Sequence, residues 1–135
     1  MKKTNSNTSI KTIIETGDAP AAIGTYSQAV KAGDFVYVSG QIPLTPDSGE
    51  LVSDDFIQQA QQVFSNLSAI ALAAESNLND SVKLTVYLTD LAMFPVLNEI
   101  MAEYMQAPFP ARAAVEVAAL PKGAQIEIDA ILYVR

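Results

Sequence analysis

The chain has 135 residues and contains no cysteine, histidine or tryptophan. This composition excludes disulfides, Ser-His-Asp and Cys-His nucleophile pairs, and zinc sites of the usual nitrogen and sulfur kind, so any proton transfer falls to Asp, Glu, Lys, Tyr or water. Fifteen acidic residues against eight basic ones give a formal charge of −7, the wrong sign for attraction to nucleic acid or to an anionic membrane.

The composition predicts one domain with a polar arm before it. Residues 1–10 are polar and are predicted to form a flexible N-terminal arm, and residues 11–135 are predicted to form a single domain. The basic start is not followed by the apolar stretch of a secretory signal, and the segment 56–74 holds too many amides for a membrane span, so a cytoplasmic protein is predicted. Hydrophobic residues make up 50% of the chain, which favours an oligomer interface.

The first predicted elements are a strand and a long helix. The run from Phe35 to Ser39 is rich in β-branched and aromatic residues and is predicted to end at Gly40. Ser53 is predicted to cap a helix over 54–75, with acidic residues in its first turn. Its apolar residues recur at helical spacing: Phe56, Ala60, Val63, Phe64, Leu67, Ile70 and Ala74.

Alternating apolar and polar residues over 82–89 predict a strand with one buried face. Pro95 suits the first turn of a second helix, which Pro108 and Pro110 would end, and two further strands are predicted over 112–118 and 125–134. The apolar stripe of this second helix comprises Leu97, Ile100, Met101, Tyr104 and Met105. This order predicts an α+β fold with two helices packed on one face of a mixed sheet.

Arg112 is the most informative single residue, because a guanidinium among small and apolar neighbours requires a planar anionic partner. That partner is either the carboxylate or phosphate of a ligand, or an internal carboxylate of Glu116, Glu127 or Asp129. From spacing alone the internal ion pair is the more common arrangement.

Four further positions are candidates with ordinary alternatives. Glu127 and Asp129 occupy one face of the last strand, where a half-buried carboxylate can hold or deprotonate water, although such a face is more often simply solvated. Gly40 permits close approach of a ligand to the backbone but is equally compatible with a turn or bulge. Asn98 lies beside the apolar stripe of the second helix, where a hydrogen-bonded core amide is the common outcome. The six glycines form no phosphate-binding pattern, so no nucleotide cofactor is predicted.

Several strings in the same order resemble the RidA family, formerly called YjgF, over residues 13–134. They are Ala21 to Gln28, Ser39 to Pro43, Phe109 to Arg112, Val115 to Val117, Leu120 with Pro121, and Ile126 to Ile128. The resemblance implies a chorismate-mutase-like α+β fold, a homotrimer with sites between subunits, and no cofactor or metal. It also implies hydrolysis of reactive 2-imino and enamine acids, such as 2-aminoacrylate and 2-iminobutanoate, to 2-keto acids and ammonia.

By the same resemblance, Arg112 would bind the substrate carboxylate and Glu127 would hold the attacking water. Tyr26, Ser39, Gly40 and Asn98 match the remaining pocket positions, and Ala114 occupies a further one at which its backbone N–H can still contact the ligand. This implied role for Arg112 reverses the preference for an internal ion pair.

The sequence departs from the family pattern at Ala114, where many relatives have cysteine, and in a turn over 105–108 that looks shortened. The polar arm is also additional. Two other functions remain open at this stage. One is a trimer that binds 2-keto acids or other small carboxylates without turnover, and the other, less supported by charge and composition, is an endoribonuclease or translation inhibitor.

Overall fold

The computed structural model describes residues 10–134, so the predicted arm lies outside the described residues apart from Ile10. Six strands form one sheet in the order β2-β3-β4-β7-β5-β6. The strands are β2 (Thr12–Ile14), β3 (Ala29–Ala32), β4 (Phe35–Gln41), β5 (Ser81–Leu88), β6 (Ala111–Glu116) and β7 (Ile126–Tyr133). The helices are α1 (Phe56–Ala73) and α2 (Phe94–Tyr104), with short 3-10 turns η1 (Leu78–Asp80), η2 (Leu91–Met93) and η3 (Pro121–Gly123).

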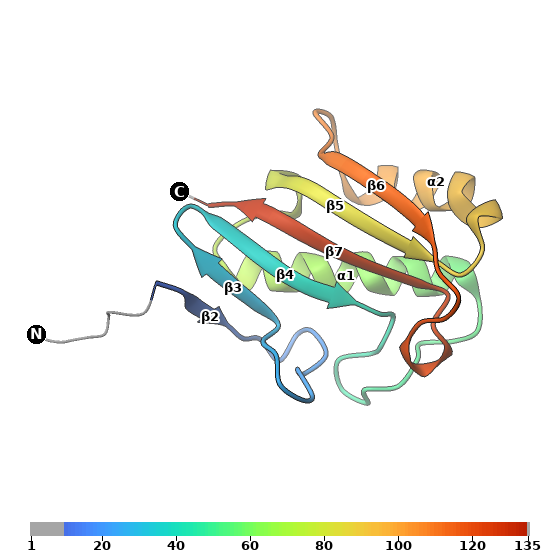
Figure 1. The fold of residues 1–135 in the computed structure, drawn as a ribbon, viewed down its shortest axis with the longest axis horizontal. Helices are drawn as coiled ribbons and strands as arrows, with labels where there is room; N and C mark the ends of the chain where they lie inside the picture. The colour runs from blue at the N-terminus through green and yellow to red at the C-terminus, as the bar shows by residue number, and fades with distance from the viewer. Residues whose placement is uncertain (1–9, 135) are drawn as a thin grey trace, which may run out of the picture.

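Both helices cover the same face of the sheet, and the other face is left open (Figure 1). The sheet is mixed because β6 pairs with β5 in parallel while every other described pair is antiparallel. The predicted α+β architecture, with two helices on one face of a mixed sheet, is therefore confirmed. Within the described residues no helix has the length and apolar character needed to cross a membrane.

Helix α1 forms the centre of the core. It is two residues shorter at each end than predicted, and its N-cap is Asp55, whose carboxylate accepts a hydrogen bond from the Gln58 amide at 3.0 Å. Ser53 is not the cap as predicted, because its hydroxyl instead accepts a bond from the Asp55 amide. The Phe64 ring stacks on Tyr104 of α2 at 5.4 Å between centroids, which joins the two helices.

Strand β7 alternates as predicted, and β5 does so from Leu84 to Leu88. Val82, predicted on the buried face of β5, is instead 42% exposed, because the pairing with β7 shifts between Ser81 and Lys83. On β7, Ile126 and Ile128 are buried beneath the helices, whereas Glu127 and Asp129 point to the open face. Strand β4 does not end at Gly40 as predicted but continues to Gln41. The pairing of β4 with β7 shifts between Val38 and Gln41, so Gly40 lies in a bulge rather than at a strand end.

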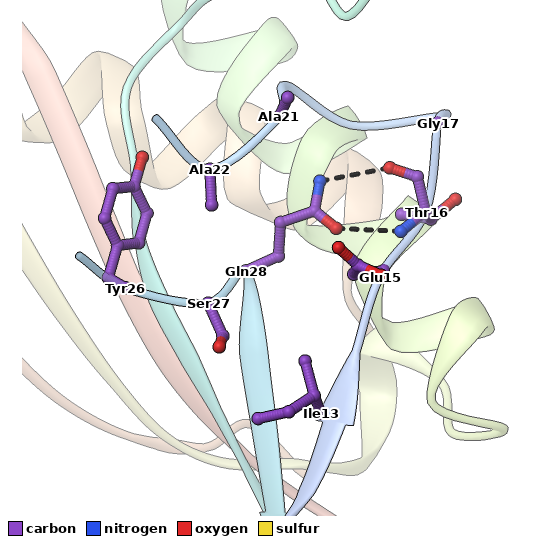
Figure 2. A pocket seen from close by; sticks show the side chains of 9 residues that line it. All are labelled: Ile13, Glu15, Thr16, Gly17, Ala21, Ala22, Tyr26, Ser27 and Gln28. Carbon is purple, nitrogen blue, oxygen red and sulfur yellow. Dashed lines mark hydrogen bonds between the residues drawn. The ribbon is translucent and has the colours of Figure 1, made fainter. Parts of the chain in front are cut away.

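Two short strands, β2 and β3, were not predicted from the sequence. The loop between them has little regular structure and is held by the buried side chain of Gln28. The Gln28 oxygen accepts a bond from the Thr16 amide at 2.8 Å, and its nitrogen donates to the carbonyls of Thr16, Ala19 and Pro20 at 3.0, 3.3 and 2.8 Å. Figure 2 shows this amide hydrogen-bonded to Thr16, and both residues line a cavity of about 430 Å³.

The open face of the sheet carries exposed large apolar side chains. They are Ile13, Phe35, Tyr37, Val115 and Tyr133, each at least 38% exposed. Their register places them on one surface, and the rings of Phe35 and Tyr133 meet edge to face at 5.7 Å. An apolar surface of this kind is typical of a protein interaction site.

Candidate functional site

Arg112 lies on the edge strand β6, with its side chain on the helix side of the sheet. One terminal nitrogen donates to the Asn98 side-chain oxygen at 2.6 Å and lies 3.5 Å from the Met101 sulfur. The guanidinium carbon lies 4.7 Å from the centroid of the Phe94 ring, a cation–π distance. All three neighbours belong to α2.

The internal ion pair that spacing favoured for Arg112 is not formed within residues 10–134. The physical reason is the arrangement of the sheet. Strand β5 separates β6 from β7, so Glu127 and Asp129 lie beyond reach. The Glu116 carboxylate accepts a hydrogen bond from the Leu91 amide instead.

Asn98 is not the core amide that its position beside the apolar stripe suggested. Its neighbours Leu97, Ile100 and Met101 are buried, but Asn98 itself is exposed at the rim of α2. The hydrogen bond from Arg112 therefore gives the exposed Asn98 oxygen a partner and orients the exposed guanidinium.

Two cavities adjoin Arg112. The first, of about 390 Å³, is lined by Asn98, Met101, Ala102, Phe109, Pro110 and Arg112. The second, of about 380 Å³, is lined by Leu91, Phe94, Arg112 and Ala114. The structure thus brings together three of the predicted residues, Asn98, Arg112 and Ala114, which we call the arginine half-site.

Glu127 lies in a different cavity, of about 420 Å³, which also contains Tyr26 and Gly40. We call these three residues the glutamate half-site. A Cβ atom on Gly40 would overlap the Glu127 carboxylate and stand 2.9 Å from its carboxyl carbon. Gly40 therefore leaves room for the Glu127 side chain, whereas its position in the sequence had suggested that it lets a ligand approach the backbone.

The carboxylates on the open face are half-buried rather than freely solvated. Burial raises the pKa of Glu127, and the charge of nearby Asp129 raises it further. The Tyr87 hydroxyl donates to the Asp129 carboxylate at 3.1 Å. Burial and the bond to Asp129 raise the pKa of Tyr87 in turn, so this phenol stays protonated and remains a donor.

Ser39 and Tyr26 frame the glutamate half-site. The Ser39 hydroxyl donates to the Ser27 carbonyl at 2.6 Å and so joins β4 to the segment that carries Tyr26. The Tyr26 hydroxyl accepts a weak bond from the Ile23 amide at 3.4 Å, and its ring is 53% exposed. Ser39 thus supports the cavity, and Tyr26 lines it.

The two half-sites lie on opposite faces of the sheet. Arg112 is level with buried Leu84 of β5, whereas Glu127 is level with Tyr87 on the open face. Paired residues on adjacent strands point to the same side, so within one chain the two groups point away from each other. A ligand of a few atoms cannot contact both groups of one chain.

Sequence reasoning missed the residues that fix these groups. Phe94 and Met101 looked like ordinary apolar helix positions, and Tyr87 looked like the polar partner in an alternating strand. For Tyr87, the only signal in the sequence was its alternating position in β5, which indicates the face of the sheet. Its neighbours on that face depend on the register with β7, and the sequence does not show this register. Residues 10–134 hold no cluster of three or more acidic side chains that could bind a metal ion.

The chain is thus a small α+β protein with a one-sided mixed sheet, a cation on the helix side of the sheet and a half-buried carboxyl on its open face. A sequence profile of the family described as endoribonuclease L-PSP matches residues 16–134. The chain belongs to this family, which is the RidA (YjgF) family that its motifs resemble.

Relatives agree over nearly their whole length. The chain is 48% identical over 122 residues to human 2-iminobutanoate/2-iminopropanoate deaminase, covering 90% of this chain and 89% of that protein. It is 55% identical to the crystal structure of RidA from an Antarctic Psychrobacter, with a TM-score of 0.88 and coverage of 91% and 99%. Escherichia coli TdcF, solved with bound serine, is 42% identical with a TM-score of 0.85 and coverage of 92% and 99%.

Proposed function

We propose that this protein is a 2-iminobutanoate/2-iminopropanoate deaminase that hydrolyses 2-imino and enamine acids, including 2-aminoacrylate, to 2-keto acids and ammonia. The observation that supports this most directly is the pair of half-sites, one with a cation suited to a carboxylate and one with a half-buried carboxyl suited to a proton. Relatives at 46–48% identity carry the same activity in their names.

Arg112 is the group proposed to bind the substrate carboxylate. A guanidinium has five N–H donors, and one of its terminal nitrogens is already committed to Asn98. The remaining donors form a planar fork that matches a carboxylate. In a chain of net charge −7, such a local cation is needed to attract an anionic substrate.

Glu127 is the group proposed to hold the attacking water. A protonated imine is already an electrophile, so the protein has only to orient the water and accept its proton. The water oxygen bonds to the imine carbon and its proton passes to Glu127. Return of that proton to the nitrogen makes ammonia the leaving group. As the carbon–nitrogen bond breaks, the new hydroxyl passes its remaining proton to Glu127, which leaves the keto group and releases ammonia.

Because one chain directs Arg112 and Glu127 to opposite faces, we propose that each site combines the arginine half-site of one subunit with the glutamate half-site of another. The exposed apolar residues of the open face favour burial between copies of the chain. A homotrimer with three such sites satisfies both requirements. Light scattering of the purified protein should give the mass of three chains, and a monodisperse monomer would exclude the shared site.

Release of ammonia and keto acid from a freshly generated imine tests the activity. An amino-acid oxidase supplies the imine, and the rate above the spontaneous rate is measured. Keto-acid binding without any acceleration would instead identify the protein as a binding trimer.

Subunit mixing tests whether the site is shared. Arg112→Ala and Glu127→Gln chains are each expected to be inactive, but refolding them together should restore part of the activity. Mixed trimers then contain interfaces at which one chain supplies Arg112 and the other supplies Glu127. The matched control refolds the double variant with wild type at the same ratio. No recovery beyond the separate variants would place both groups in one subunit's site.

A further inference from the structure

Tyr87, Glu127 and Asp129 form a cluster on the open face of the sheet. Tyr87 of β5 is level with Glu127 of β7, but its hydroxyl donates to the diagonal neighbour Asp129 at 3.1 Å. Tyrosine is long enough for such a diagonal contact between adjacent strands. Its hydrogen bond is therefore directed past Glu127 to the second carboxylate.

The stability of the fold does not explain this arrangement. Two carboxylates at alternate positions of one strand face repel each other, and partial burial increases the cost of ionising them. Of the two carboxylates, Asp129 accepts the hydrogen bond of the Tyr87 hydroxyl. Within residues 10–134 of one chain, no cation forms an ion pair with Glu127. The Tyr87 hydroxyl therefore fixes the position of the Asp129 carboxylate beside Glu127.

Within one chain, the other groups that line the cavity around Glu127 leave Asp129 as the charge that acts on it. Strand β4 contributes Gly40 and Gln41, and the loop before β3 contributes Tyr26, all of them uncharged near neutral pH. Lys122 of η3 lines the same cavity, but its ammonium donates to the Gly49 carbonyl at 3.1 Å and pairs with Glu50 at 3.9 Å.

We propose that Asp129, held by the Tyr87 hydroxyl, is a positioning residue that makes Glu127 a stronger proton acceptor. This inference rests on the proposed function, in which Glu127 accepts the proton of the attacking water. Repulsion from Asp129 favours the protonated form of Glu127, so removing the Asp129 charge lowers the pKa of Glu127. The acidic limb of the pH–rate profile should then move to lower pH.

The test uses Asp129→Asn, which keeps the shape and can still accept the Tyr87 bond. The carboxyl carbons of glutamate are labelled with 13C, and the Glu127 signal, identified by its loss in Glu127→Gln, is followed against pH. The titration midpoint should fall in Asp129→Asn, and the acidic limb of imine hydrolysis should fall with it. The matched control is Glu75→Gln, which removes one exposed negative charge beyond the end of α1 and should change neither readout.

Tyr87→Phe tests the anchor. It should move the Glu127 midpoint in the wild-type background and leave it unchanged in Asp129→Asn, because Tyr87 acts through Asp129. Equal shifts in both backgrounds would overturn the role of Tyr87. An unchanged Glu127 midpoint in folded Asp129→Asn would overturn the whole proposal. A wild-type protein without imine hydrolysis would overturn the proposed function alone, since the titration is read without activity.

Discussion

The two half-sites differ in how the fold controls a charged group. Arg112 lies on an edge strand, is exposed, and is oriented by three neighbours on one helix. Glu127 lies on a central strand, is half-buried, and is influenced by burial and by a second carboxylate. The exposed guanidinium is controlled by the contacts that orient it, whereas burial and the neighbouring carboxylate raise the pKa of the enclosed carboxyl.

This difference shows how a chain without histidine can divide the work of a hydrolase. The arginine half-site is suited to binding, which requires geometry and constant charge. The glutamate half-site is suited to proton transfer, which requires an altered pKa. Substitutions at the two half-sites should therefore fail in different ways.

The largest effect is expected for Glu127→Gln, which keeps the shape of the side chain but cannot accept a proton. Turnover should fall by roughly 10² to 10⁴-fold, the range of a lost general base, while keto-acid affinity is retained through Arg112. Calorimetry measures the affinity and a coupled oxidase assay measures turnover. Asp129→Asn on the same strand should be milder, and an equal collapse in that variant would contradict the assignment of the base.

Gly40→Ala should be nearly as damaging, although it removes no functional group. The added Cβ overlaps the Glu127 carboxylate and must displace it. Displacement of about 1 Å costs on the order of 10²-fold in rate. The control is Gly17→Ala, where a Cβ would meet no atom within 4 Å. Wild-type turnover in Gly40→Ala would show that the position of Glu127 does not limit the rate.

Arg112→Ala should weaken ligand binding rather than slow proton transfer. The loss of a charge-assisted, two-pronged contact is about 1.5 to 3 kcal/mol, or roughly tenfold to over a hundredfold in keto-acid affinity. Arg112→Lys should restore little, because an ammonium lacks the planar fork. Retention of wild-type affinity, or unfolding of the alanine variant, would instead assign Arg112 a structural role.

A smaller effect is expected at Phe94, which contacts the guanidinium without touching the ligand. Phe94→Leu should raise KM by about two- to fivefold, since a cation–π contact at a partly exposed position is worth roughly 0.5 to 1 kcal/mol. Phe94→Tyr keeps the ring and should behave as wild type in the same steady-state assay. Equal KM values for the leucine and tyrosine variants would rule out ring stacking as the cause.

The smallest effect is a gain in stability. The pKa of Glu127 is raised in the folded protein, so between the unfolded and the folded pKa the folded protein binds more protons than the unfolded chain. The free energy of unfolding therefore falls as pH rises through this range, and the loss is complete above the folded pKa. Glu127→Gln should therefore have a slightly higher Tm at neutral pH, and the difference should vanish below the unfolded pKa. Calorimetric scans at neutral pH and below the unfolded pKa measure this difference in Tm. A lower Tm for the variant at neutral pH would contradict the expected gain in stability.

The sequence was sufficient for the parts of the fold that depend on local periodicity. Helix α1 and the faces of β5 and β7 follow from 3.6-residue and two-residue repeats. Strands β2 and β3 have three and four residues, too few for such a repeat. The partners of Arg112 could not be predicted because they come from a helix packed over β6, and no local pattern specifies which side chain a packed helix presents.

The separation of Arg112 and Glu127 by sheet face had the same cause. The phase of each strand is visible in its sequence, but the register between strands is not. Motif resemblance grouped the two residues in a site between subunits, and the register of β5 with β6 and β7 places them on opposite faces of one chain's sheet.

The Gln28 amide has a consequence for the glutamate half-site. Four backbone groups of this loop, the amide and carbonyl of Thr16 and the carbonyls of Ala19 and Pro20, share this one side chain as their partner, and Figure 2 shows the two bonds to Thr16. Such a segment cannot fray one residue at a time, because loss of the amide releases all of its contacts together. Opening of the Gln28 contacts should therefore free the Thr16 amide hydrogen for exchange at the same time as it releases the Ala19 and Pro20 carbonyls, and the placement of Tyr26 depends on these contacts being closed.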